Sequence, residues 1–238
     1  MMTIRLRIAS WIVDSLLSPF VGEVAGAEDF PASGPCLAVV NHLSVCDGLI
    51  LAAIANNRVR QFHFVSYRRF FVEPFIGHML RFNQAIELDE TTWEGRQRAL
   101  QDCRQKLAEG RAVAIFPEGH TAPYDRMFKA QPGAAMLALE TGVPVVPVGL
   151  IGTEKIVPRK GDLPGVRWKA VSARFGRPLD LGRYVELFAR SDRRRRLDIA
   201  LGVSTIIMRA VATLSGQVYP HGAKFLQRLD RLSLGSAG

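Results

Sequence analysis

The sequence predicts an α/β fold, in which a central, mixed but mostly parallel sheet is flanked by helices and preceded by an N-terminal amphipathic helix. Short apolar runs alternate with helical patterns along the chain, which favours a sheet layered between helices. The runs are rich in Val and Ile and mostly lack polar alternation, as expected for strands covered on both faces. With 238 residues, the chain is long enough for one large domain and short for two.

Five apolar runs are expected to form the central strands: residues 36–41, 62–66, 85–88, 112–116 and 143–151. Each is short and bounded by turn residues or by a helical pattern. A sixth run, residues 168–176, alternates between polar and apolar side chains. This alternation is typical of a strand with one exposed face, so we expect it near an edge of the sheet.

Helices are expected between these strands. Residues 91–109 have apolar positions on one face, and Thr91 with Glu94 fits a capping box at the start. A second helix is expected at 132–141, before a glycine that would end it. The chain from Arg190 onward reads as helical.

The first 30 residues are expected to form a membrane-associating segment. Arg5 and Arg7 interrupt its apolar stretch, which makes it a poor candidate for a membrane-spanning helix. Its apolar residues recur at helical spacing: Ile4, Ile8, Trp11, Ile12 and Leu16. Such a helix lies in the membrane interface or packs on its own domain, and both interpretations stay open. We predict an α/β core at 31–190 and a C-terminal helical segment at 191–238 packed on it.

The charge balance points to an anionic partner. Lys and Arg total 31 against 22 Asp and Glu, a net charge of +9, which attracts an anionic membrane surface or another polyanion. Nucleic acid is not expected, because the chain has neither an RNA-binding aromatic motif nor zinc-finger spacing. The run Arg193 to Arg196 is more typical of a solvated helix face. Three cysteines without a CxxC pair argue against a disulfide framework and fit a reducing cytoplasm.

The first motif with chemical content is VVNHLSVCDG, residues 39–48. On one continuous helix, positions five apart would face about 140° from each other, so His42 and Asp47 can meet only across a turn. The expected strand-to-helix turn provides this, and Asp47 would accept a hydrogen bond from one imidazole nitrogen of His42. The pair would then be a base and its orienting group, without a protein nucleophile. Taken alone, this spacing is more typical of a structural histidine and a helix N-cap.

A second motif is AIFPEGHT, residues 114–121, in which a strand runs into a turn. Gly119 would let the backbone turn sharply and let a ligand approach closely. Backbone amides at such a turn can hold a phosphate group. Further along, the prolines of residues 142–152 suit a strand with interrupted pairing that lines a cleft.

In this order, NHLSVCD, FVEPFIG, FPEG and VPVVPVGL resemble the glycerolipid acyltransferase family, whose best-known members are the 1-acylglycerol-3-phosphate acyltransferases. The similarity runs from about Val39 to Ile151, with a looser fit at RFGRPLD, residues 174–180. The resemblance implies an α/β acyltransferase core and a thioester donor, either acyl-carrier protein or acyl-coenzyme A. It also implies that His42 is the catalytic base and that Asp47 orients it. No metal or other cofactor is expected, because the spacing of His42, Asp47, Glu118 and His120 matches no metal motif and the chemistry needs none.

The same resemblance implies transfer of a fatty acyl group to a hydroxyl of a lysophospholipid, 1-acylglycerol-3-phosphate, in phospholipid biosynthesis. The protein would be peripheral, at the cytoplasmic face of the membrane. The expected acceptor-binding residues are Glu118, Gly119, His120, Thr121, Arg68 and Arg69.

Two departures from the family pattern bear on the acceptor. The pattern usually continues after Glu-Gly with Thr-Arg, whereas His120 and Thr121 stand in those places here, without the arginine. The second motif usually offers a lysine near the position of Tyr67, which is followed here by Arg68 and Arg69. Cations that would meet a phosphate instead are Arg68, Arg69, Arg126 and Lys129.

Two alternative functions stay open at this stage. The missing arginine allows an acceptor without a phosphate, such as a lyso-aminolipid. A protein of another class, a non-catalytic membrane-binding module, would also carry a basic surplus. Cys46 lies inside the first motif, but we expect a small buried side chain there and not a nucleophile.

Overall fold

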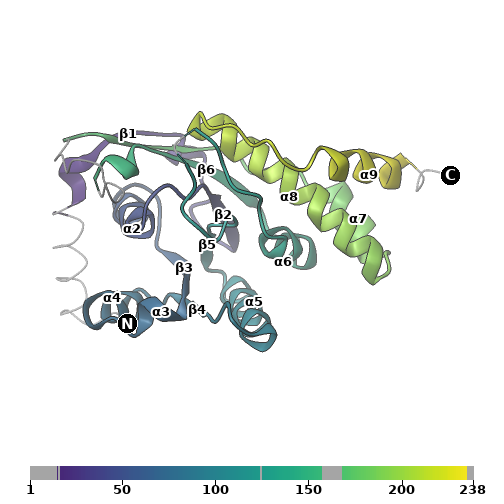
Figure 1. The fold of residues 1–238 in the computed structure, drawn as a ribbon, viewed down its shortest axis with the longest axis horizontal. Helices are drawn as coiled ribbons and strands as arrows, with labels where there is room; N and C mark the ends of the chain where they lie inside the picture. Colours follow the sequence, from purple (N-terminus) through teal and green to yellow (C-terminus); the bar gives the residue numbers. More distant parts are fainter. Residues whose placement is uncertain (1–14, 16, 124, 157–167, 235–238) are drawn as a thin grey trace.

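The computed structural model describes residues 15, 17–123, 125–156 and 168–234. These form one seven-stranded sheet with the strand order β1-β7-β6-β2-β5-β3-β4 and helices on both of its faces (Figure 1). Every neighbouring pair is parallel except β6 and β7, so the predicted α/β fold with a mixed, mostly parallel sheet is confirmed. The strands are β1 (Val21–Ala25), β2 (Cys36–Val40), β3 (Phe62–Tyr67), β4 (Ile86–Leu88), β5 (Ala112–Ile115), β6 (Val145–Ile151) and β7 (Val171–Phe175).

Eight α-helices are described in this part of the chain: α2 (Asp47–Arg58), α3 (Arg68–Phe71), α4 (Pro74–Phe82), α5 (Trp93–Ala108), α6 (Gly133–Thr141), α7 (Gly182–Ala189), α8 (Arg193–Ser215) and α9 (Ala223–Leu234). Three 3-10 helices accompany them: η1 (Ser18–Phe20), η2 (Ala27–Asp29) and η3 (Thr153–Lys155). The core has two parts, one on each face of the sheet. Helices α5 to α9 contribute to one part, and α2 contributes to the other.

The five predicted central strands are present, and the strand predicted within residues 168–176 lies near an edge of the sheet, as expected. Strand β7 lies second from the edge, because β1 pairs with it in parallel and forms the edge. The alternation in β7 does reflect one buried and one more open face. Residues 21–25, expected in the membrane-associating segment, therefore belong to the sheet. Most of the predicted amphipathic helix falls on residues 1–14 and 16, outside the described residues.

The predicted capping box of α5 is wrong, and the N-cap lies one residue later than expected. Thr92, and not Thr91, is the N-cap, and its hydroxyl accepts a hydrogen bond from the Gly95 amide at 3.0 Å. The Thr91 hydroxyl instead donates to a carboxylate oxygen of Asp89 at 2.5 Å. Because the Thr91 hydroxyl is bonded to Asp89, Thr92 is the residue whose hydroxyl caps the helix.

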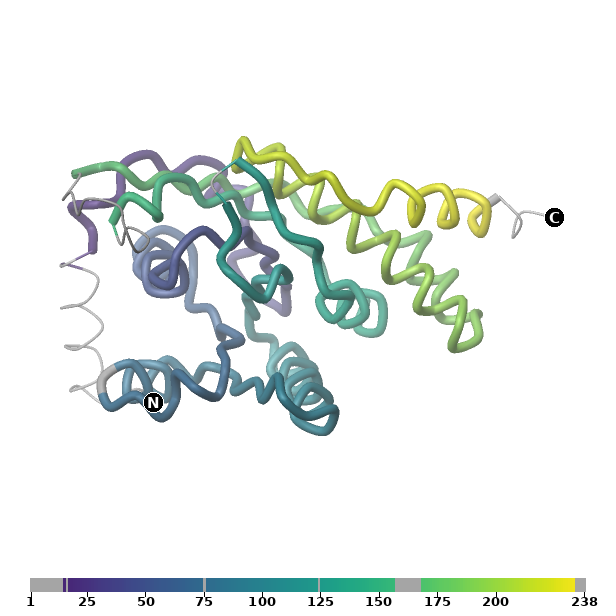
Figure 2. The backbone as a smooth tube through the Cα atoms, viewed as in Figure 1, coloured from purple at the N-terminus to yellow at the C-terminus, as the bar shows by residue number. Residues whose placement is uncertain are grey.

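The C-terminal helices cover one face of the sheet. The backbone trace shows α8 crossing the molecule and α9 running back beside it toward the C-terminus (Figure 2). Among the described residues, α8 is long and apolar enough to cross a membrane, and 56% of its most apolar window is buried inside the protein. Its contacts with β6 and α9 account for that apolar character as packing.

Candidate active site

The two chemical motifs meet at one edge of the sheet. Strands β2 and β5 are parallel neighbours, with Val39 opposite Ile115. Their carboxyl ends therefore lie side by side, and the turns that follow them face each other across that edge. In open α/β sheets this is the place where ligands bind.

The turn after β2 brings His42 and Asp47 together. His42 Nδ1 lies 2.8 Å from Asp47 Oδ2, and the Asp47 side chain is completely buried. The same oxygen accepts hydrogen bonds from the amides of Leu43 and Ser44, at 2.6 and 3.0 Å. Because Asp47 Oδ2 accepts hydrogen bonds from these two amides, it is also the acceptor in the contact with the imidazole. The imidazole proton is therefore on Nδ1, and Nε2 has a free lone pair.

The His42 ring remains reachable from outside. Its side chain keeps 22% of its surface exposed, and the ring packs against Phe116 with a centroid distance of 4.8 Å. Phe116 belongs to the second motif, so this contact also ties the two turns together. The arrangement is an oriented imidazole base at a strand end, with one nitrogen held and the other available.

Glu118 is held by backbone amides at both of its carboxylate oxygens. Its contact with the acceptor, which the sequence leads us to expect, stays a prediction. Oε1 accepts from His42 N at 2.9 Å, and Oε2 accepts from Phe128 N at 2.6 Å. The side chain is buried, and burial raises its pKa to about 7, although the two amide hydrogen bonds act in the opposite direction. Glu118 thus fixes the backbone of the His42 turn.

Gly119 and Tyr67 join the ends of β5 and β3. Gly119 has a φ of 72°, a left-handed conformation that favours glycine. The Tyr67 hydroxyl donates a hydrogen bond to the carbonyl oxygen of Gly119 at 2.5 Å. The Tyr67 ring also lies 6.3 Å from the His120 ring, centroid to centroid. Thr121 follows with a half-buried side chain.

Arg68 and Arg69 lie on the surface beside this turn. Arg68 pairs with Glu87 and Asp89, at 3.4 and 3.3 Å. Arg69 pairs with Glu90 at 3.5 Å, and its guanidinium stacks on Tyr67, 4.6 Å from the ring centroid. Of the two arginines, Arg69 is linked to the Gly119 turn, because it stacks on Tyr67 and the Tyr67 hydroxyl bonds to Gly119.

Three contacts around His42 lie beyond the reach of motif reading. The Ala122 amide donates to the His42 carbonyl oxygen at 2.7 Å. Asn41 is buried, and its side chain pairs with the backbone of Leu150 in β6 and with Gln217. Asn41 has a weak local signal, a polar residue that ends an apolar strand directly before the histidine. Gln217 has none, since it lies 176 positions away.

Comparisons with known proteins identify the family. The acyltransferase family model matches residues 22–151, more than half of the chain. The chain belongs to the acyltransferase family. The matched region contains both motifs and every predicted site residue, whereas helices α7, α8 and α9 lie beyond it.

Named members of the acyltransferase family are similar over the same region. A chloroplastic 1-acyl-sn-glycerol-3-phosphate acyltransferase from Brassica napus is 32% identical over 62% of this chain and 42% of its own length. One from Arabidopsis thaliana is 32% identical over 62% of this chain and 41% of its own. One from Pseudomonas aeruginosa is 28% identical over 60% of this chain and 53% of its own. The matches to the plant relatives thus span less than half of those proteins.

The fold agrees with a solved member of the family. The crystal structure of the 1-acyl-sn-glycerophosphate acyltransferase PlsC from Thermotoga maritima superposes with a TM-score of 0.61. The superposition covers 88% of this chain and 79% of the Thermotoga chain, at 22% sequence identity. This likeness establishes the acyltransferase fold for the described part of the chain.

Cys46 lies within this acyltransferase motif as a buried side chain. It is 8% exposed, and its sulfur lies 3.2 Å from Ser44 Oγ and 3.7 Å from the carbonyl oxygen of Thr153. Burial raises the pKa of the thiol to about 11, which disfavours the thiolate that a nucleophile requires. The placement fits a small residue that fills space behind the turn.

No group of three or more His, Cys, Asp or Glu side chains that could hold a metal ion occurs in the described part. A groove of about 440 Å³ lies between α4, β4 and α5 and includes none of the predicted site residues. The His42 turn is identified as the candidate site by its side-chain chemistry.

Proposed function

We propose that this protein is an O-acyltransferase that moves a fatty acyl group from an acyl thioester to a hydroxyl of a lyso-lipid. The observation that carries the proposal is the His42 ring, held at Nδ1 by buried Asp47 and partly exposed, at the strand edge of an acyltransferase-family fold. A base of this kind needs no protein nucleophile, because the acceptor hydroxyl itself attacks the thioester.

In the proposed reaction, His42 Nε2 takes the proton of the acceptor hydroxyl while its oxygen attacks the thioester carbonyl carbon. A carbon–oxygen bond forms, and the carbonyl oxygen carries the negative charge of a tetrahedral intermediate. When this collapses, the carbon–sulfur bond breaks and the thiol leaves with the proton held on His42. Asp47 stays hydrogen-bonded to Nδ1 and stabilises the imidazolium during the step.

The proposed acceptor is 1-acylglycerol-3-phosphate, and the donor is acyl-carrier protein or acyl-coenzyme A, both of which present a thioester. The names of the plant and Pseudomonas relatives support this acceptor. We also propose that the protein acts as a peripheral protein at the cytoplasmic face of the membrane. Exposed Val45 in the His42 turn and exposed Val72 after α3 support contact with lipid, together with the net charge of +9.

The direct test supplies the purified protein with acyl-coenzyme A or acyl-carrier protein and a panel of lyso-lipids, and identifies the products by mass. Transfer that requires His42 supports the proposal. Vesicle binding by native protein that transfers no acyl group to any lyso-lipid would instead support a non-catalytic membrane-binding module.

For the acceptor head group, we propose that Arg69 supplies the positive charge that the missing arginine would bring. Its stacking on Tyr67, whose hydroxyl reaches Gly119, connects it to the turn that matches the acceptor motif. Its ion pair with Glu90 is at the surface, so an arriving phosphate can displace it at little cost. Arg68 is held instead by two carboxylates, Glu87 and Asp89.

The head-group proposal is tested by Arg69→Ala with a phosphorylated acceptor and with a neutral lyso-lipid. We expect the KM of the phosphorylated acceptor to rise by about tenfold or more, the loss of one hydrogen bond to a charged group. The donor KM and the neutral acceptor should change little. Arg98→Ala, which removes an exposed arginine of α5, is the matched control. An unchanged acceptor KM would favour the second candidate, a lyso-aminolipid or other non-phosphate acceptor, which the absence of arginine at Thr121 also allows.

A further inference from the structure

The segment that follows α8 returns to the candidate active site. Gly216, with a φ of 76°, ends the helix in a left-handed conformation and turns the chain. The next residue, Gln217, is a polar side chain that is only 8% exposed. A buried amide requires partners at both its oxygen and its nitrogen.

Gln217 finds these partners on two different loops. Its Oε1 accepts a hydrogen bond from Asn41 Nδ2 at 2.8 Å, and its Nε2 donates to the carbonyl oxygen of Pro123 at 3.2 Å. The network fixes this orientation, because Asn41 Oδ1 already accepts from the Leu150 amide at 2.7 Å, so its nitrogen faces Gln217. Asn41 directly precedes His42. Pro123 directly follows Ala122, whose amide holds the His42 carbonyl.

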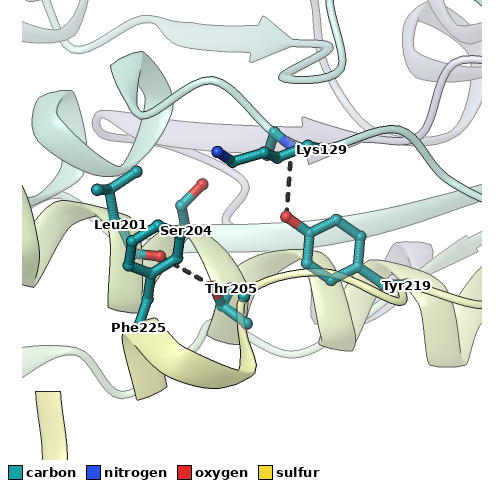
Figure 3. A pocket seen from close by; sticks show the side chains of 8 residues that line it. Lys129, Leu201, Ser204, Thr205, Tyr219 and Phe225 are labelled. Carbon is teal, nitrogen blue, oxygen red and sulfur yellow. Dashed lines mark hydrogen bonds between the residues drawn. The ribbon is translucent and has the colours of Figure 1, made fainter. Parts of the chain in front are cut away.

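The backbone beside Gln217 reinforces the same loop. Val218 N donates to the Asp125 carbonyl, and Met127 N donates to the Val218 carbonyl, both at 2.9 Å. The Tyr219 hydroxyl accepts a hydrogen bond from the Ala130 amide at 3.3 Å, beside the small cavity of about 10 Å³ that Lys129 and Phe225 help to line (Figure 3). The segment 217–219 is therefore hydrogen-bonded at several points to the chain between Pro123 and Ala130. The same stretch contains Phe128, whose amide donates to Glu118.

We infer that Gln217 is a positioning residue for His42, which it holds through Asn41 on one side and through the Pro123 loop on the other. The role rests on the proposed acyl transfer and adds to it a residue outside the region that the family model matches. In this role Gln217 acts through Asn41 and the Pro123 loop and not by contact with the reacting atoms. It fixes where the imidazole stands relative to the turn of the second motif.

Two substitutions with opposite chemistry test the inference. Gln217→Met keeps the length of the side chain and removes both hydrogen bonds. Gln217→Glu keeps an acceptor for Asn41 but places an ionised carboxylate against the Pro123 carbonyl oxygen. When protonated, that carboxyl donates to Pro123 again. Thr213→Ala is the matched control, since this exposed α8 hydroxyl bonds only within its own helix.

With Gln217→Met we expect kcat to fall about 10- to 100-fold at all pH values, while the KM values change less than about twofold, because a misplaced base slows chemistry. With Gln217→Glu, the ratio of its kcat to that of the native protein should rise as pH falls. Thr213→Ala should match the native protein. A kcat within about twofold of native for Gln217→Met, or a pH-independent ratio for Gln217→Glu, overturns the inference.

Hydrogen exchange separates this inference from the proposed function and from unfolding. The amides of Ala122 and Leu150 should exchange faster in Gln217→Met than in the native protein, whereas that of Ala38, inside β2, should not. Exchange that is unchanged at Ala122 and Leu150 overturns the positioning role. A native protein without acyl transfer would refute the proposed function, and the exchange pattern would still decide whether Gln217 holds the His42 turn.

Discussion

The turn after β2 and the short helix α3, which forms the turn after β3, lie at the same edge of the sheet and are built in opposite ways. In the turn after β2, the carboxylate of Asp47 is fully buried and one of its oxygens accepts three hydrogen bonds. In the turn after β3, Arg68 and Arg69 have 63% and 57% of their side chains exposed and pair with surface carboxylates. In the first turn, hydrogen bonds from several groups fix the position of Asp47 and His42. In the second, the arginines pair with exposed carboxylates that another anion can replace.

This difference matches the demands of the two proposed tasks, proton transfer by His42 and binding of the acceptor head group by Arg69. A base must stand within hydrogen-bond reach of the proton that it takes, so its orientation has to be fixed before substrate arrives. A charged head group can be met by flexible cations, because an exposed ion pair contributes about 0–1 kcal/mol and is easily replaced. Changes in the first turn should therefore cost turnover, whereas changes in the second should alter affinity.

The largest expected effect is that of His42→Ala. Loss of the base should lower kcat by about 10²–10⁴-fold without changing the fold, since the side chain contributes one hydrogen bond at a partly exposed position. Asp47→Asn should also lower kcat, by favouring the wrong tautomer of His42. The rate of thiol release from the acyl thioester measures both.

His78→Ala is the control for this experiment, because it removes an exposed histidine from α4. It should retain native turnover. If His42→Ala turns over like the native protein, the turn after β2 is a rigid structural element and the contrast between the two turns has another origin.

The second prediction concerns the pH dependence of stability through Glu118. Its pKa is raised from 4.5 to about 7 in the folded protein, so between these values the native state keeps a proton that the unfolded state has lost. The resulting stabilisation is full below about pH 4.5 and is lost as pH rises through about 7. The gap corresponds to about 3 kcal/mol.

Glu118→Gln removes this titration, so its free energy of unfolding should fall less between pH 5 and pH 8 than that of the native protein. Denaturant unfolding at both pH values measures the difference. Equal changes in the two proteins would mean that Glu118 is charged throughout, and that its two amide hydrogen bonds outweigh its burial.

The features that sequence could predict are those encoded locally. Each central strand has its own apolar run, and His42 and Asp47 are five residues apart, so one turn decides whether they meet. Strand β1 was missed because the segment VGEVA is short and contains a glutamate, and its partner β7 lies about 150 residues downstream.

The contacts of Glu118 and Gln217 could not be predicted for the same reason. Glu118 meets the His42 amide across 76 positions, and the register of β2 against β5 decides that its carboxylate reaches that amide. Gln217 depends on where α8 ends after crossing the sheet. The motif FPEG marks a turn that matches the family pattern but does not say which of its residues would contact substrate.

A smaller effect is expected from Gly119→Ala, at the junction between the two turns. An alanine at a φ of 72° costs about 1–2 kcal/mol. Its Cβ would also lie 2.9 Å from the Tyr67 hydroxyl, which must move. We expect a lower melting temperature and a higher acceptor KM.

Gly34→Ala separates the two causes, because Gly34 has a φ of 77° and no atom within 4 Å of an added Cβ. It should lose similar stability and keep the native KM. If Gly119→Ala also keeps the native KM, the Tyr67 contact is not part of acceptor binding, and the turn after β3 is separate from the site.

The smallest effect on stability is expected from Arg68→Ala and Arg69→Ala. Their ion pairs lie at the surface and are screened by salt, so each substitution should change the free energy of unfolding by less than about 1 kcal/mol. The change should shrink further in 0.5 M salt, about the concentration at which charges more than a few ångströms apart are largely screened. Arg69→Ala should nevertheless weaken binding of a phosphorylated acceptor, so that function responds strongly and stability hardly at all. A loss of stability well above 1 kcal/mol in either variant would mean that these arginines fasten α3 to the strand β4, and the turn after β3 would then be as fixed as the turn after β2.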